Sequence, residues 1–176
     1  MDTQRLADGN GIFNKENLTN YMQLMTNSMW SICNHFASPN RYYPENLGIG
    51  LFSCQVQMLR DLDKDFRLGY INICKEDLGG LGKKFLSNPK QTNRWKKLRL
   101  KHLWTLNKIE CNLLGKFSFR IGVFWMITNL IYIIQLTRIE AQLNGRSSAF
   151  GLLKSLFTGG KHFFIYLIKV IPLWKA

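Results

Sequence analysis

The sequence has few of the features that are typical of secreted domains or of small domains stabilised by a metal ion. Its 176 residues include four cysteines, at positions 33, 54, 74 and 111, and no two of them form a C-x-x-C pair. This spacing argues against a zinc ribbon and against a dense disulfide framework, so we expect reduced and mostly buried thiols. Residues 1–14 are polar and contain no apolar run of the length found in a secretory signal. We therefore do not expect secretion.

Enzyme signatures are missing as well. The three histidines, at 35, 102 and 162, are far apart, and none is spaced with a cysteine or a carboxylate as metal ligands are. The sequence contains no G-x-S-x-G and no H-E-x-x-H motif. We expect a protein without catalytic residues, metal site or cofactor, and hence not an enzyme.

Segments with the two-residue period of a β-strand are also lacking, whereas helical spacing is common. Apolar residues recur three and four positions apart at about 16–37, 47–68 and 93–114. The sequence therefore predicts an all-α fold with amphipathic helices, one transmembrane helix and a C-terminal membrane-associated helix. The predicted regions are a flexible arm at 1–14, a helical N-terminal region at 15–82, a basic amphipathic helix region at 83–116, the transmembrane helix at 117–138, and a linker with a C-terminal amphipathic, membrane-associated segment at 139–176.

Three local signals refine this division. Asn14 is a predicted N-cap of the first helix, and Gly69 is a predicted C-terminal stop of the second. In the last region, we expect Gly159 and Gly160 to interrupt the helix, as well as Pro172.

Acidic residues are scarce in the second half of the chain. Residues 83–176 contain 17 Lys+Arg and 2 Asp+Glu, whereas residues 1–82 contain 7 and 9. A basic half beside a nearly neutral one predicts an anionic partner for the second half only, either a lipid surface or a nucleic acid.

The cations are densest from Lys83 to Lys108, where nine Lys or Arg occur without an acid. They could neutralise nucleic-acid phosphates while tryptophans stack on bases, or they could lie on anionic lipid headgroups. We favour an anionic lipid membrane over a nucleic acid, because an apolar segment begins fewer than ten residues after Lys108. The residues predicted to contact the membrane surface are Trp95, Lys96, Lys97, Leu98, Arg99 and Lys101.

One long uncharged apolar run is present, at residues 121–137. Its 17 residues span about 25 Å as a helix, and counting from Phe117 gives 21 residues and about 31 Å, enough to cross a hydrocarbon core. The alternative is a buried helix of a soluble core. Three polar side chains in the run, Thr128, Asn129 and Gln135, are predicted to pack against other membrane helices or a second copy of this chain.

The order of short motifs resembles that of the peroxin-eleven family, membrane proteins that proliferate peroxisomes. The resemblance rests on QMLR at 57–60 with DFRLG at 65–69, on FSFR at 117–120 followed by Trp125 and NLI at 129–131, and on LIKVIPL at 167–173. It implies a non-enzymatic protein whose amphipathic helices insert into one leaflet and elongate an organelle membrane. A peroxisomal membrane is the favoured location, and a mitochondrial membrane is the alternative.

Two other functions stay open at this point. A small membrane-anchored subunit of a larger complex, such as a mitochondrial respiratory assembly, would explain the polar residues in the apolar run. An RNA-binding ribosomal component would explain the basic charge. Vesicles separate these hypotheses, because a remodelling protein deforms them alone whereas a subunit needs its partners.

Overall fold

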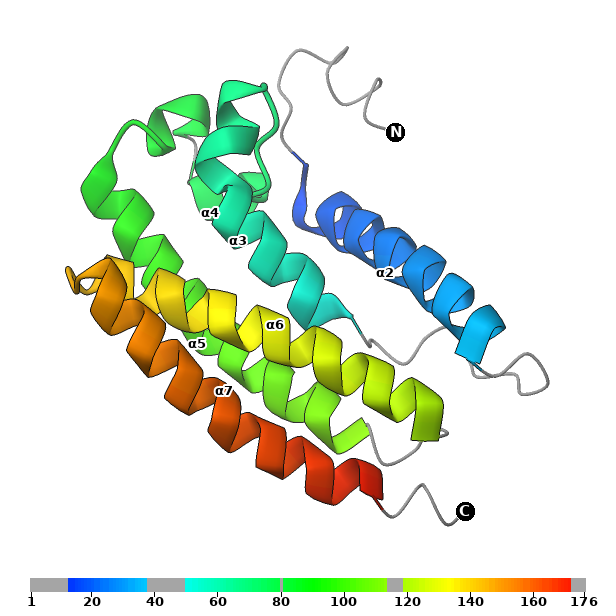
Figure 1. The fold of residues 1–176 in the computed structure, drawn as a ribbon. Coiled ribbons are helices and arrows are strands. Elements are labelled where there is room, and N and C mark those ends of the chain that lie inside the picture. The colour runs from blue at the N-terminus through cyan, green and yellow to red at the C-terminus, as the bar shows by residue number, and fades with distance from the viewer. Residues whose placement is uncertain (1–12, 38–49, 80, 114–118, 172–176) are drawn as a thin grey trace.

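The computed structural model describes residues 13–37, 50–79, 81–113 and 119–171. These ranges form helices and no β-strand, so the predicted all-α class is confirmed. One of the described helices, α6, is long and apolar enough to cross a membrane. The elements in chain order are α2 (Lys15–Ala37), α3 (Leu51–Arg67), α4 (Lys75–Leu78), the 3-10 helix η1 (Gly82–Phe85), α5 (Pro89–Leu113), α6 (Phe119–Leu143) and α7 (Ser148–Val170) (Figure 1).

Local chemistry explains where several helices begin and end. The side-chain oxygen of Asn14 accepts a hydrogen bond of 2.7 Å from the backbone N–H of Asn17 at the start of α2. Ser147 caps α7 in the same way, through a 3.2 Å bond from the N–H of Phe150. Gly69 follows α3 with φ of +88°, a conformation that glycine adopts without strain. The predicted cap at Asn14 and stop at Gly69 are therefore confirmed.

The predicted helix ranges agree with the structure to within a few residues. Helices expected at 16–37 and 93–114 correspond to α2 and α5. The one expected at 47–68 overlaps α3, and its residues 47–49 lie outside the described part of the chain. Helix α6 continues to Leu143, five residues beyond the predicted end of the apolar segment.

The expected break at Gly159 and Gly160 is wrong, because α7 runs through both glycines without interruption. Gly159 faces α6, where a Cβ atom would lie 3.3 Å from Cγ1 of Ile134. The close helix contact that the missing side chain allows offsets the poor helix propensity of glycine, about 1 kcal/mol per residue. Pro172, the other expected break, lies outside the described residues.

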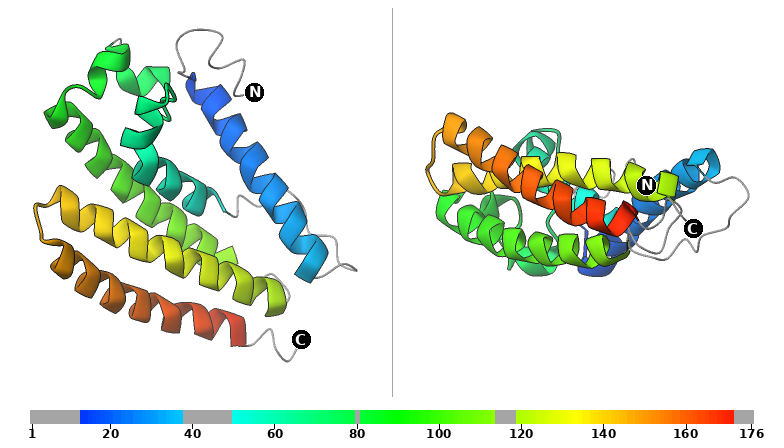
Figure 2. Two further views of the ribbon diagram at one scale, coloured as in Figure 1. Left: turned by 45° about the horizontal axis from the view of Figure 1, so that its top comes forward. Right: turned by 60° about the horizontal axis from the view of Figure 1, so that its bottom comes forward.

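Helix α6 is the centre of the fold, since it contacts α2, α3, α5 and α7. Its side chains Trp125, Ile133 and Leu136 are fully buried, and Phe52 of α3 and Leu103 of α5 join the same core. Helices α6 and α7 form an antiparallel hairpin (Figure 2), and α5 packs against both of them. The polar turn at 144–147 that joins the hairpin contains Gly145 with φ of +67°.

Candidate membrane-contacting surface

The outward side of α7 is a wide apolar surface, which we call the α7 face. Its side chains are all at least partly open to solvent, and Phe157 and Ile168 are the most exposed, at 73% and 71%. The α7 face consists of Phe150, Leu152, Leu153, Leu156, Phe157, Phe163, Phe164, Ile168 and Ile171. Soluble proteins rarely leave a contiguous apolar surface of this kind uncovered, so the face marks a contact with lipid or with another protein.

Helix α6 extends this surface on its side next to α7. Ile127, Ile131 and Ile134 follow one another at the four- and three-residue spacing of a single helix stripe. Ile134 packs against Gly159 of α7, while Ile127 and Ile131 are each about half exposed. The apolar surface therefore belongs to the whole hairpin and not to α7 alone.

The charges of α7 are all positive and flank its apolar face. The helix contains Lys154, Lys161 and Lys169 and no Asp or Glu. Lys154 and Lys161, seven residues apart, lie along one edge of the face. Lysine stems can cover apolar surface while their ammonium groups stay in water or among phosphates. This arrangement is typical of a helix that lies at a lipid interface.

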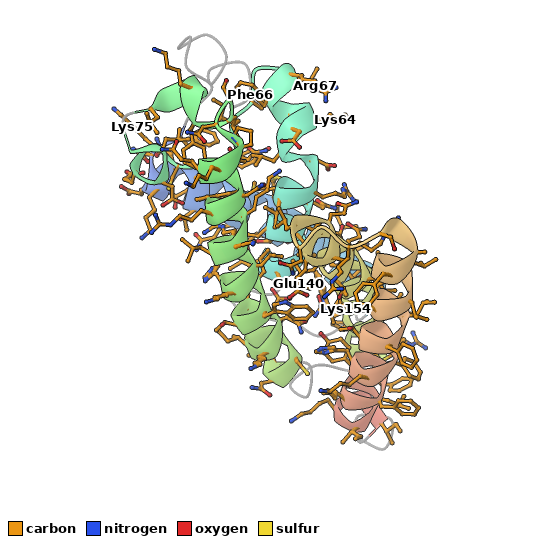
Figure 3. The ribbon with its side chains drawn as sticks, turned by 90° about the vertical axis from the view of Figure 1, so that its left-hand side faces the viewer. Lys64, Phe66, Arg67, Lys75, Glu140 and Lys154 are labelled. Carbon is orange, nitrogen blue, oxygen red and sulfur yellow. The ribbon has the colours of Figure 1, made fainter. Side chains whose placement is uncertain are left out.

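Close backbone approach fixes the hairpin. A Cβ atom at Gly151 would lie 3.2 Å from Cβ of Ala141, which repeats the tight contact made by Gly159. Lys154 and Glu140 point toward each other across the two helices and form a 2.9 Å ion pair (Figure 3). The apolar surface is thus carried by a rigid pair of helices.

A second surface, which we call the α5 stripe, is basic. Lys90, Arg94, Lys97 and Lys101 recur along α5 at four- and three-residue spacing and are all exposed. With Asn93 and Leu98 they line a shallow groove of about 500 Å³. None of the four cations forms an ion pair within the described ranges.

The structure separates the six residues predicted to meet a membrane. Lys97, Leu98 and Lys101 lie in the α5 stripe, and Leu98 is 59% exposed. Trp95 packs against the core, and its Nε1–H donates a 3.1 Å hydrogen bond to Asp77. Trp95 therefore faces the protein, whereas Leu98 faces the solvent.

The remaining two cations of that set also stay close to the protein. Lys96 pairs with Asp63 of α3 at 3.5 Å. The guanidinium of Arg99 lies 5.8 Å from the centre of the Trp95 ring, which is within cation–π range. Of the six predicted residues, three therefore point outward and three face α3 and α4. The outward three are Lys97, Leu98 and Lys101.

The three polar residues predicted to pack between helices lie on α6, and two of them do so within the chain. Asn129 is buried, and the amide oxygen of Gln135 accepts a 2.9 Å hydrogen bond from Arg60 of α3. The hydroxyl of Thr128 donates to the carbonyl oxygen of Phe124 on its own helix. Whether these residues also contact another chain stays a prediction.

Sequence reasoning missed the buried carboxylate of Glu110 on α5. Helix α3 has Gly50 as its N-cap residue and therefore no side-chain cap, and the N–H of Phe52 donates a 2.7 Å hydrogen bond to Oε1 of Glu110 instead. Burial raises the pKa of Glu110 to about 7. Its spacing in the sequence could have indicated burial, because residues 103, 107 and 110 lie on the same side of a helix, and this side of α5 is buried.

The comparisons with known proteins leave the surface to be interpreted from its own chemistry. No family model, curated protein or solved structure matches the chain. Among the described residues, no cluster of His, Cys, Asp or Glu has the arrangement of a metal site. The arrangement consists of a helical bundle with one apolar surface and one basic surface.

Proposed function

We propose that this protein is a non-enzymatic, membrane-associated helical bundle that inserts the α7 face into one leaflet of an organelle membrane and thereby bends it. The observation that supports this proposal most strongly is the exposure of the α7 face. Its nine large apolar side chains have exposed fractions between 39% and 73%. Moving each into lipid contributes on the order of 1 kcal/mol, since half of a side chain is removed from water.

Lipid explains this surface better than a protein partner does. The charges of α7 are all positive, and Lys161 lies at the edge of its apolar face, which suits contact with phosphate headgroups around an inserted helix. The resemblance to the peroxin-eleven family supports the same function and favours a peroxisomal membrane. A wedge in one leaflet expands that leaflet relative to the other, which favours curvature and elongation.

The packing of the bundle favours an in-plane position of α6 and α7 over a spanning one. Helix α5 lies alongside α6 and exposes Arg94, Lys97, Lys101 and Lys108. If α6 crossed a bilayer in this arrangement, those cations and Lys161 of α7 would be held at the depth of the hydrocarbon. Each would cost about 2.5 to 3.5 kcal/mol at the centre of a membrane. Lying in the plane leaves the cations of both helices in water or among headgroups.

Vesicles test the proposal directly. The purified full chain is mixed with vesicles of neutral lipid and with vesicles that contain 30% anionic lipid, and bound protein is measured by flotation. Electron microscopy then records vesicle shape. We expect flotation with both compositions and tubules drawn from the vesicles by the protein alone. Flotation without deformation would favour the membrane-anchored subunit, and binding to RNA without flotation would favour the ribosomal component.

The position of the hairpin is tested with a protease site inserted after Gly145, in the turn between α6 and α7. On sealed vesicles, an in-plane hairpin leaves this turn outside, so the added protease cuts it. A spanning α6 carries the turn to the lumen and protects it. A second protein with the same site after Gly79, beyond α4, is the control, because that turn is cut in both arrangements.

A further inference from the structure

The α5 stripe and the α7 face lie on different sides of the molecule. In Figure 3 the green α5 stands on the left and the orange to red α7 on the right. Both helices pack against α6, and they also contact each other: the hydroxyl of Tyr166 on α7 bonds to Asn107 of α5, and the ring of His162 stacks on Trp104. His162 and Tyr166 lie on the side of α7 opposite Phe157, so the α7 face points away from α5.

This separation prevents the stripe from reaching the bilayer that holds the α7 face. A helix with its side chains is about 10 to 12 Å wide, and a lysine side chain extends only about 6 Å from the backbone. With the α7 face embedded, the width of α7 separates α5, with Lys97 and Lys101, from the lipid headgroups. The exposed stripe then faces the solution.

The stripe itself has the form of a contact for an extended anionic surface. Its first and last cations, Lys90 and Lys101, are 11 residues apart, which corresponds to a straight row of about 16 Å. The groove contains no acidic residue, and Leu98 is its only large apolar lining residue. A flat layer of phosphates meets such a row along its whole length, whereas a protein partner would need apolar contacts as well.

We propose that the α5 stripe binds the anionic surface of a second bilayer, so that one protein bridges two membranes. This inference rests on the proposed function, because the α7 face must hold the first membrane. Four cations make a weak contact for one molecule. Many copies on one vesicle act together, and their combined binding far exceeds that of one stripe.

The test uses two sets of vesicles. Neutral vesicles are loaded with the full chain and separated from free protein by flotation. Fluorescent vesicles with 30% anionic lipid are then added, and their capture is measured by light scattering and co-flotation. We expect capture by the wild-type protein at 50 mM salt and at least a tenfold decrease at 500 mM salt, because the contact is screened.

Two variants with equal loss of charge locate the contact. The quadruple variant Lys90→Gln, Arg94→Gln, Lys97→Gln and Lys101→Gln removes the stripe. The control variant Lys64→Gln, Arg67→Gln, Lys75→Gln and Lys84→Gln removes four exposed cations elsewhere; the first three are labelled in Figure 3. We expect the stripe variant to load normally onto neutral vesicles and to capture at least tenfold fewer anionic vesicles, with the control close to wild type.

The possible failures are distinguishable. Wild-type protein that does not load onto neutral vesicles would overturn the proposed function and the inference with it. Loaded protein that captures no anionic vesicles, or a stripe variant that captures them like wild type, would overturn the inference alone. The inference also fails if single-stranded RNA, at the same phosphate concentration as the vesicles, binds the loaded protein more tightly and displaces the captured vesicles.

Discussion

Helices α5 and α7 have nearly the same length, 25 and 23 residues, and both pack along α6, yet they expose opposite chemistry. The exposed side of α5 carries a row of cations that water solvates well. The exposed side of α7 carries phenylalanine, leucine and isoleucine, which water solvates poorly. The difference indicates that the two helices face different surroundings, although the same hydrophobic core positions both.

The contacts that hold the two helices in the bundle also differ. Helix α7 is held against α6 by close backbone contact at Gly151 and Gly159 and by apolar side chains. Helix α5 is held by buried polar groups as well, since Glu110 accepts a hydrogen bond from the N–H of Phe52 on α3 and Asn107 accepts one from the hydroxyl of Tyr166 on α7. Changes to the α7 face should therefore alter membrane binding without unfolding, whereas changes at Glu110 should alter stability.

The largest expected effect comes from making the α7 face resemble the α5 stripe in polarity. Phe157→Glu with Phe164→Glu replaces two of the most exposed aromatic side chains with charges. We expect a loss of at least about 3 kcal/mol of vesicle affinity, more than a hundredfold, because apolar burial is lost and charge must be desolvated. Flotation measures the loss of vesicle affinity, and circular dichroism checks that the variant is folded. Leu24→Glu with Ile32→Glu on α2 is the matched control and should float normally.

Adjacent glycines on α7 separate attachment from membrane contact. Gly159→Leu inserts a side chain where Cγ1 of Ile134 already lies 3.3 Å from the position of a Cβ atom, so we expect a loss of about 1 to 3 kcal/mol of folding stability. Gly160→Leu meets no atom within 4 Å and gains helix propensity of about 0.8 kcal/mol. Gly160→Leu should also bind vesicles more tightly. Urea unfolding and flotation measure both variants, and equal stability of the two would contradict the packing of Gly159 on α6.

The pH dependence of stability isolates the polar attachment of α5. Burial raises the pKa of Glu110 from 4.5 to about 7, so the folded state keeps a proton that the unfolded chain releases. Stability from this group is complete below pH 4.5 and is lost as the pH rises to about 7. Glu110→Gln keeps an acceptor for the N–H of Phe52 and carries no charge. We expect this variant to exceed wild type by about 3 kcal/mol at pH 8 and to equal it near pH 4.5.

Urea unfolding of wild type and Glu110→Gln across this pH range makes the measurement. Burial lowers the pKa of His102 and His162, but this contribution is common to both proteins and cancels in the difference. A difference that does not change between pH 4.5 and 8 would show that Glu110 is not buried against α3.

Much of the fold follows from local sequence, because helix spacing and caps act over a few residues. The apolar periods of α2 and α5, the cap at Asn14 and the stop at Gly69 were all predictable. The continuity of α7 was not, because Gly159 is compatible with a helix only through its contact with α6. Local propensity favours a break there, and tertiary packing overrides it.

Local sequence is also insufficient to predict which side chains form the surface of the protein. The basic character of α5 is visible in the sequence, but the division of its residues depends on partners far along the chain. Trp95 is turned inward by Asp77, 18 residues earlier, and Glu110 by Phe52, 58 residues earlier. Residue composition cannot reveal these contacts, since they exist only once the helices have packed.

The smallest expected effect concerns the ion pair between Lys154 and Glu140 in the hairpin. Their side chains are 40% and 30% exposed, so water and salt screen the 2.9 Å contact. Glu140→Gln should reduce folding stability by less than about 1 kcal/mol in urea unfolding, and by less still at 500 mM salt. Asp61→Asn, which removes the similarly exposed pair with Arg60, is the matched control and should behave alike. Vesicle flotation of Glu140→Gln should stay within twofold of wild type, because the apolar contacts at Gly151 and Gly159 keep the α7 face in place. A loss above 2 kcal/mol would instead mean that charge, and not close packing, attaches α7 to α6.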